Sequence, residues 1–318
     1  MFLQSITSII TIVLLIALGY GLKSMQWFDE GFMRGISSLI TKVALPASIF
    51  VSVLKFLTRD SLISLSSSLI YTLGAVAICY LIAFALVKIF KIPAGHRGVF
   101  INTIANANTI FIGMPLNIAL FGEKATPFFL VYYVTNTVST WAFGASLIAN
   151  DDPTRESSSH KIDWRKIMSP PLVGFIVSIV FLLLAIPVPT FINSALTYTG
   201  NLVTPLSLIY IGIVLYDAGL KSIKFDRDTS LALLGRFIIS PLVLVALIII
   251  GQHVFGQNLS VGLRQTIIVQ SAVPALAVLP ILANEAHGDV KYATNVVTTS
   301  TLLFVIVIPI LMQLIQFM

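Results

Sequence analysis

The amino-acid sequence predicts an all-α membrane protein: ten transmembrane helices form two inverted five-helix repeats, with crossing broken helices at the fourth and ninth positions. Three observations predict this fold. Hydrophobic residues make up 57% of the 318 residues and charged residues 10%, with a mean hydropathy of +0.98, whereas soluble domains are about 45–50% apolar and about 25% charged. Most apolar runs reach the roughly 20 residues that a spanning helix needs. Sequence features also repeat between the two halves of the chain.

Ten apolar runs give the predicted spans. They cover residues 5–22, 32–54, 62–87, 98–121, 125–149, 167–187, 190–216, 229–251, 263–285 and 291–315. Thirteen lysines and arginines lie near the odd-numbered connections and four near the even-numbered ones, while Lys42 and Arg236 lie within spans. Because basic residues collect on the cytoplasmic side, we expect a multi-pass protein of the cytoplasmic (inner) membrane, with odd connections inside and both termini outside.

One long polar connection, residues 151–166, divides the chain into a first repeat of residues 1–150 and a second of residues 167–318. An odd number of spans in each half inverts the second half relative to the first, as in many secondary transporters. An offset of 159 residues pairs Phe32 with Phe191, Pro46 with Pro205 and Ser48 with Ser207. Agreement over several spans favours an inverted repeat over chance.

Polar residues and prolines crowd into the middle of two spans. Asn102, Asn106, Asn108, Thr109, Gly113 and Pro115 lie in the fourth span, and Gln270, Ser271, Pro274 and Pro280 in the ninth. A helix break at mid-membrane survives only where protein or a wet cavity satisfies the backbone. Two breaks at matching positions predict a binding site near the midplane; the alternative is that they are proline kinks and interhelical hydrogen bonds.

All 13 acidic residues fall in connections or at span ends, so no carboxylate is expected at mid-membrane to exchange a proton or sodium ion. Neutral donors and positive half-helix N-termini favour an organic anion. The sequence holds no GxSxG, HExxH or Walker motif, which argues against an enzyme. The four histidines lie on different connections, so we expect no metal site: His96, His160, His253 and His287. We also expect no cofactor. The net charge of +6 requires no nucleic-acid partner, because basic residues of membrane proteins collect in cytoplasmic loops.

Two cations and a second group of polar residues have open roles. Lys42 and Arg236 either face protein or water, or extend their charged ends to the membrane surface. The second group lies in the fifth and tenth spans, where packing and cavity lining are both open: Asn136, Thr137 and Ser139, then Asn295, Thr298, Thr299 and Ser300.

Three motifs resemble the auxin efflux carrier family, which includes the plant PIN-type auxin exporters and bacterial malate permeases. They are NANTIFIGMPL from Asn106, GRFIISP from Gly235 and IVQSAVP from Ile268. The likeness covers nearly the whole chain. It implies an elevator-type carrier with a transport domain of the third to fifth and eighth to tenth helices. The first, second, sixth and seventh helices would form a scaffold and a homodimer contact.

The candidate site follows from these motifs, with Asn106 and Ser271 added from the polar clusters. The substrate-binding candidates are Asn106, Asn108, Thr109, Gln270 and Ser271, and the crossover-geometry candidates are Gly113, Pro115 and Pro274. Two positions depart from the plant motif, which has proline in place of Ala107 and glutamine in place of Ala275. The short central connection is similar to that of bacterial members, so a small carboxylate such as malate is expected rather than auxin.

The sequence therefore indicates a secondary carrier of a small organic anion that works by alternating access. Three alternatives stay open at this point. One is a sodium-coupled organic anion symporter of the bile-acid type, and another is a membrane receptor that binds the anion without moving it. The third, an intramembrane enzyme, would need a nucleophile and a base facing each other at mid-depth.

Overall fold

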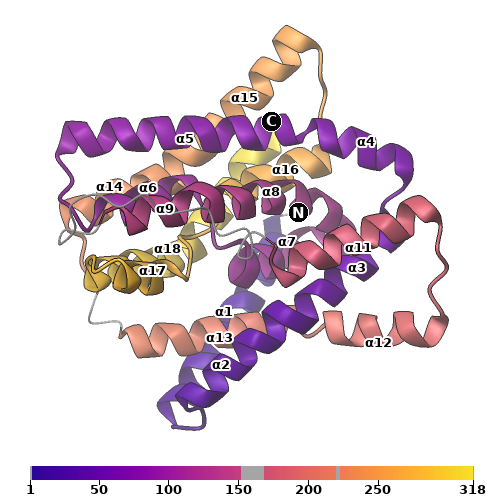
Figure 1. The fold of residues 1–318 in the computed structure, drawn as a ribbon, viewed down its shortest axis with the longest axis horizontal. Coiled ribbons are helices and arrows are strands. Elements are labelled where there is room, and N and C mark those ends of the chain that lie inside the picture. The colour runs from indigo at the N-terminus through magenta and orange to yellow at the C-terminus, as the bar shows by residue number, and fades with distance from the viewer. Residues whose placement is uncertain (1, 152–167, 220–222, 318) are drawn as a thin grey trace. The chain divides into compact units, whose positions relative to one another are not determined.

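The computed structural model describes residues 2–151, 168–219 and 223–317, and all its regular elements there are helices (Figure 1). The predicted central connection, residues 151–166, lies outside the described part except for Asp151. The α-helices are α1 (Phe2–Ser24), α2 (Glu30–Leu39), α3 (Leu45–Phe56), α4 (Arg59–Ser67), α5 (Leu69–Phe90), α6 (Arg97–Ala105), α7 (Met114–Phe121), α8 (Thr126–Ser139), α9 (Ala145–Ala149), α11 (Pro170–Leu184), α12 (Thr190–Gly200), α13 (Val203–Ala218), α14 (Arg227–Leu234), α15 (Ser240–Phe255), α16 (Val261–Ser271), α17 (Leu279–Glu285) and α18 (Val290–Leu314).

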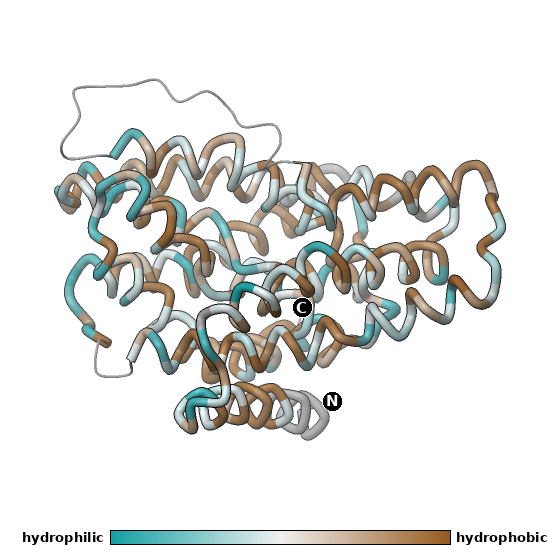
Figure 2. The backbone as a smooth tube through the Cα atoms, turned by 60° about the horizontal axis from the view of Figure 1, so that its bottom comes forward, coloured by the Kyte–Doolittle hydropathy of each residue, from teal (hydrophilic) through white to brown (hydrophobic). Residues whose placement is uncertain are grey.

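Shorter helical turns join several of these helices. In the described part of the chain, four are π-helical, η1 (Ile40–Ala44), η2 (Thr109–Gly113), η4 (Thr140–Gly144) and η6 (Gly235–Ile239), and two are 3₁₀ turns, η3 (Glu123–Ala125) and η7 (Ile315–Phe317). Apolar stretches run along the helices, and hydrophilic residues lie chiefly at helix ends and connections (Figure 2).

Within the described residues, six helical stretches are long and apolar enough to cross a membrane: Gly31–Phe56, Leu65–Ile89, Arg97–Phe121, Thr190–Ala218, Arg227–Val254 and Val290–Leu314. Two shorter apolar helices, Ile10–Ser24 and Pro170–Leu184, accompany them. The membrane-protein class is therefore confirmed, and the count of ten spans stays a prediction. The predicted third span, residues 62–87, overlaps the stretch Leu65–Ile89 and contains a break at Ser68, between α4 and α5.

The described chain forms two compact units, each assembled from separate stretches of sequence. Unit 1 is drawn from Met1–Ser67, Ile110–Val131 and Met168–Asp217, and unit 2 from Ser68–Thr109, Tyr132–Ile167 and Ala218–Met318. Unit 1 thus contains the four spans that the resemblance assigns to a scaffold. The fourth and fifth spans are divided, since the chain changes unit after Thr109 within η2 and after Val131 within α8.

Small residues bring helices close together inside unit 1. A Cβ atom at Gly19 of α1 would lie 2.1 Å from the Ile209 carbonyl oxygen of α13, and one at Gly212 would lie 2.0 Å from the Ile16 carbonyl oxygen. Only glycine fits at both positions, so the backbones of α1 and α13 are in direct contact, as is common for helices in membranes.

Unit 2 has two apolar clusters. Val99, Leu279, Ala283, Ala293 and Val296 are core members of the first, which joins α6, α17 and α18. The second joins α5, α6 and α14 through Cys79, Ala83, Phe100, Ile104 and Ala232. α6 contributes to both clusters, and this anchors its broken end inside the unit.

In unit 2, the odd-numbered connections between the predicted spans lie close to one another. At the odd-numbered connections, His96 lies 3.1 Å from Asp228 and 3.3 Å from Asp289, and its ring stacks on Tyr292. Asp151 joins this end, because its carboxylate accepts the Gly98 N–H at 2.9 Å. Away from these connections, the Tyr71 hydroxyl in the first turn of α5 donates to Gln257 in the eighth connection at 2.9 Å.

Unit 1 shows the same grouping. Lys23 and Asp217, beside the first and seventh connections, form an ion pair at 3.4 Å. Lys55 and Glu123, beside the second and fourth, form another at 3.2 Å. Within each unit the ends alternate as expected of a chain that crosses a membrane repeatedly. Which end faces the cytoplasm stays a prediction.

Three of the four described π-turns are followed closely by a proline. Pro46, Pro115 and Pro241 each stand two residues after the end of η1, η2 and η6. A proline ring clashes with the carbonyl four residues earlier and offers no N–H, and a wider π-turn relieves this clash. These prolines therefore explain where the spans deviate from regular α-helix.

Candidate functional site

The fourth and ninth predicted spans are both interrupted, as the sequence predicted. α6 ends at Ala105, Asn106 is extended (φ −117°, ψ 149°), and helix resumes at Thr109. α16 ends at Ser271, and α17 begins only at Leu279, after a non-helical stretch around Pro274. Asparagine and proline thus break these helices at the positions where the sequence clusters them.

The two interruptions meet inside unit 2. The Asn108 backbone N–H donates to the Pro274 carbonyl oxygen at 2.8 Å. Asn106, Asn108, Thr109, Gln270 and Ser271 have side chains between 0 and 4% exposed, and Pro274 is also buried. Six of the eight candidate residues therefore belong to one unit. Gly113 and Pro115 lie in the part of the fourth span that belongs to unit 1.

Asn106 is held by three hydrogen bonds within unit 2. Its Nδ2 donates to the Tyr80 hydroxyl at 2.8 Å and to Asn102 Oδ1 at 2.9 Å, and its Oδ1 accepts from the Ser139 hydroxyl at 2.6 Å. Asn102 in turn donates to the Gly144 carbonyl at 2.9 Å. Both N–H groups of the Asn106 amide are thus used, so a donation from Asn106 to an anionic substrate would have to replace one of these contacts.

Asn136 of α8 holds the fourth-span break from the side. Its Oδ1 accepts the Ala107 N–H at 2.7 Å, and its Nδ2 donates to the Ala107 carbonyl at 2.9 Å and to the Thr109 hydroxyl at 3.3 Å. The plant motif has proline, which lacks an N–H, at the position of Ala107. In this chain Asn136 accepts that N–H, so the break is stable without the proline.

The ninth-span break has a comparable support from α18. The Ala275 N–H donates to the Ser300 hydroxyl at 3.2 Å. Ser300 stands ten residues after the first residue of α18, as Asn136 does in α8. Sequence reasoning named both residues only as packing or cavity lining. Their matching positions in the fifth and tenth spans were the signal that could have linked them to the breaks.

Arg236 connects the ends of the two broken half-helices. It is fully buried, and its guanidinium donates to the Ile104 carbonyl in the last turn of α6 at 3.2 Å and to the carbonyl of Ser271, the last residue of α16. The Ser240 and Tyr132 hydroxyls lie at 3.2 and 3.4 Å. Among the described residues no carboxylate forms an ion pair with Arg236. The cation therefore faces the negative ends of two helix dipoles.

Lys42 has a different environment from Arg236. It lies in η1 of unit 1 and is exposed on the surface of the protein chain. From the sequence the same two roles were open for both cations, but only Arg236 is enclosed by protein.

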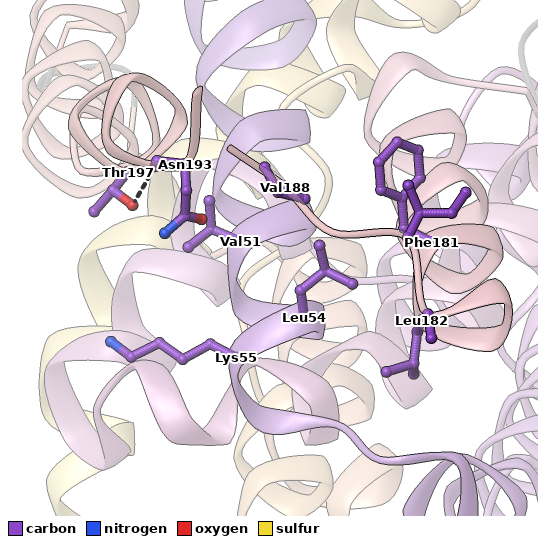
Figure 3. A pocket seen from close by; sticks show the side chains of 10 residues that line it. Val51, Leu54, Lys55, Phe181, Leu182, Val188, Asn193 and Thr197 are labelled. Atoms are coloured by element: carbon purple, nitrogen blue, oxygen red, sulfur yellow. Dashed lines mark hydrogen bonds between the residues drawn. The ribbon is translucent and has the colours of Figure 1, made fainter. Parts of the chain in front are cut away.

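A pocket of about 600 Å³ lies in unit 1, and its lining includes no residue of the interrupted segments (Figure 3). Its lining is mostly apolar, with Val51 and Leu54 from α3, Phe181 and Leu182 from α11, and Val188 from the following connection. Lys55, Asn193 and Thr197 add polar groups. The Lys55 ammonium extends away from Phe181 and Leu182 in Figure 3 and pairs with Glu123. This leaves the broken helices of unit 2 as the better candidate for an anion site.

Comparison with known proteins shows the family of this chain. Residues 4–312 match the family described as membrane transport protein. An uncharacterized transporter of Methanocaldococcus jannaschii is 23% identical over 299 residues, which cover 92% of this chain and 93% of that protein. An uncharacterized transporter of Methanothermobacter thermautotrophicus is 25% identical over 318 residues, with 97% of each chain covered. The chain thus belongs to a membrane transporter family rather than to an enzyme family, and this is the auxin efflux carrier type of membrane transport protein that its motifs resemble.

Proposed function

We propose that this protein is a secondary carrier of a small, malate-like organic acid anion across the cytoplasmic membrane. Asn108, Thr109, Gln270 and Ser271 are the substrate-binding residues we assign. Asn106, adjacent in sequence, is held by its hydrogen bonds to Tyr80, Asn102 and Ser139. Unit 2 would move against unit 1 by alternating access, and two copies would associate through unit 1. The inverted repeats of residues 1–150 and 167–318 would supply one broken helix each.

One observation carries the proposal: Arg236 binds the terminal carbonyls of both α6 and α16. Carbonyls at half-helix C-termini are groups that coordinate sodium in other carriers. Here the guanidinium occupies them and offsets a partial negative charge of about half a unit at each end. The remaining groups are neutral amides and hydroxyls, which suit a carboxylate.

The same observation separates the proposal from its rivals. A sodium-coupled symporter of the bile-acid type would need oxygen ligands near the break, and Arg236 already holds the Ile104 and Ser271 carbonyl oxygens. A receptor that only binds the anion fits less well with a family and relatives described as transporters. We therefore favour an anion carrier that needs no sodium.

Counterflow of labelled malate in proteoliposomes, with and without sodium, tests the proposal. We expect uptake into malate-loaded vesicles that is independent of sodium, and we expect Asn108→Ala and Gln270→Ala to abolish it without unfolding the protein. Asn193→Ala, on an exposed position of α12, is the control and should transport normally. If Asn108→Ala and Gln270→Ala both transported at the parent rate, the site assignment would be wrong.

A further inference from the structure

Two asparagines of unit 2 make the same set of contacts at different places. Asn136 accepts the Ala107 N–H, donates to the Ala107 carbonyl, and donates to the Thr109 hydroxyl. A side-chain amide that bonds to both backbone groups of one residue replaces the partners which that residue would have in a helix. Ala107 is held in this way outside any helix.

Asn295 of α18 repeats the pattern on Lys224. Its Oδ1 accepts the Lys224 N–H at 2.8 Å, and its Nδ2 donates to the Lys224 carbonyl at 2.8 Å and to the Thr229 hydroxyl at 3.0 Å. Lys224 is also outside any helix. The Thr299 hydroxyl donates to Asn295 Oδ1 at 3.2 Å and helps to orient the amide.

Asn295 stands five residues before Ser300, the residue of α18 at the position that Asn136 has in α8. The two asparagines therefore share their contacts but not their position in the repeats. Asn136 is 3% exposed and Asn295 5%. The three contacts of each asparagine are therefore buried, and the loss of a buried hydrogen bond to the backbone is costly. The matching contacts make a shared role a better explanation than two unrelated packing contacts.

Both contacts lie beside places where the chain passes between the units. The chain leaves unit 2 after Thr109 and returns at Tyr132, one turn before Asn136 on α8. Asn136 thus ties the outgoing segment to the incoming helix. The chain enters unit 2 again at Ala218, and Asn295 fixes Lys224 shortly after that point.

We propose that Asn136 and Asn295 are positioning residues that anchor to unit 2 two of the chain segments leading to unit 1. Asn136 holds the Ala107 backbone and the Thr109 hydroxyl and acts through the adjacent Asn108 and Thr109, so it sets the affinity for substrate. Asn295 acts through the segment before α14 and so sets how the movement of unit 2 is transmitted to the chain that joins it to unit 1. This assignment rests on the proposed transport function.

Hydrogen exchange and malate counterflow on the same full-length variants test the assignment. In Asn136→Ala, amide exchange around residues 105–109 should accelerate, and the KM for malate should rise about tenfold, the equivalent of one buried hydrogen bond. The maximal rate should stay within about twofold of the parent. In Asn295→Ala, exchange around residues 223–229 should accelerate, and the maximal rate should fall about tenfold at nearly unchanged KM, as for changes in hinge segments.

Isosteric and neighbouring variants separate hydrogen bonding from volume. Asn136→Asp and Asn295→Asp keep the side-chain size and the acceptor but lose both donations, so each should behave like its alanine variant. Thr135→Val removes a buried bond to Thr72 one residue from Asn136, and Thr294→Val removes a hydroxyl bond to the Val290 carbonyl one residue from Asn295. Both valine variants should keep parent kinetics.

Hydrogen exchange and malate transport each test a different part of the assignment. If the alanine variants left exchange at both segments unchanged, or if they changed KM and maximal rate alike, the anchoring role would be wrong. If the parent protein moved no malate while the exchange changes occurred as expected, the proposed substrate would be wrong and the anchoring contacts would stand.

Discussion

Arg236 is the residue whose removal should most directly change the charge of the site. Because its guanidinium donates to the Ile104 and Ser271 carbonyls, Arg236→Gln leaves buried helix ends without their cation. We expect this variant to unfold at lower temperature, with a loss of at least about 2 kcal/mol, and to bind malate at least about tenfold more weakly.

Thermal-shift titration with malate measures both effects. Arg236→Lys keeps a charge but replaces the planar fork with a point charge, so its affinity should lie between those of the parent and Arg236→Gln. Equal affinity for malate in all three proteins would show that the cation has no electrostatic role in binding.

At the scale of single elements, η4 of the fifth span is tied to the fourth span through Gly144. A Cβ at Gly144 would lie 2.1 Å from Asn102 Oδ1 and 3.0 Å from Asn106 Nδ2. Gly144→Ala should therefore displace both amides, destabilise the protein by about 1–3 kcal/mol and reduce transport.

Gly21→Ala provides the matched control for this substitution. Gly21 lies inside α1 with no atom within 4 Å of the added Cβ, so alanine should be neutral or stabilising by up to about 1 kcal/mol. Melting temperatures of both variants in detergent decide the comparison. A neutral Gly144→Ala variant would contradict the packing of η4 on the fourth span.

The helix interruptions could be predicted from the sequence because their causes are local. Asparagine and proline act on the backbone within a few residues, so Asn106, Asn108 and Pro274 indicated the breaks directly. The role of Asn136 could not be predicted in the same way, since it depends on how α8 packs against the end of α6. η4 likewise has no proline after it, and the Asn102 amide that bonds its Gly144 carbonyl comes from another span.

On the scale of the whole molecule, the cluster at the odd-numbered connections of unit 2 should respond to acid. Partial burial alone would raise the pKa of Asp289, but hydrogen bonds from the Tyr292 N–H, the His96 ring and the Lys291 N–H outweigh it, and the pKa is lowered. A depressed carboxyl pKa stabilises the folded state above the unfolded value of about 3.9. This stabilisation is lost as the pH falls through the lower folded value.

Asp289→Asn keeps a side-chain oxygen at the N-cap of α18 and removes only the charge. We expect a lower melting temperature than that of the parent at pH 7, and a difference that shrinks below about pH 4. Asp29→Asn changes the N-cap of α2 in unit 1 and controls for capping. A difference that persisted unchanged to pH 3 would contradict the assigned pKa direction.

The proposed alternating access requires one unit to move relative to the other. The units are not the two sequence halves, because each contains segments from both. If residues 1–150 and 167–318 are repeats, each repeat therefore contributes to both units. Such an arrangement would allow one unit to carry substrate while the other stays in place.

The single cysteine of the chain makes movement of the units accessible to site-directed labelling. Cys79 is 1% exposed in the second apolar cluster of unit 2, and the chain has no other thiol. A water-soluble maleimide therefore meets no accessible native target in the folded protein. Cysteines introduced at Lys124 in unit 1 and Lys91 in unit 2, both exposed, can carry a spin-label pair without a cysteine-free background, so the separation of the units can be followed spectroscopically as malate is added.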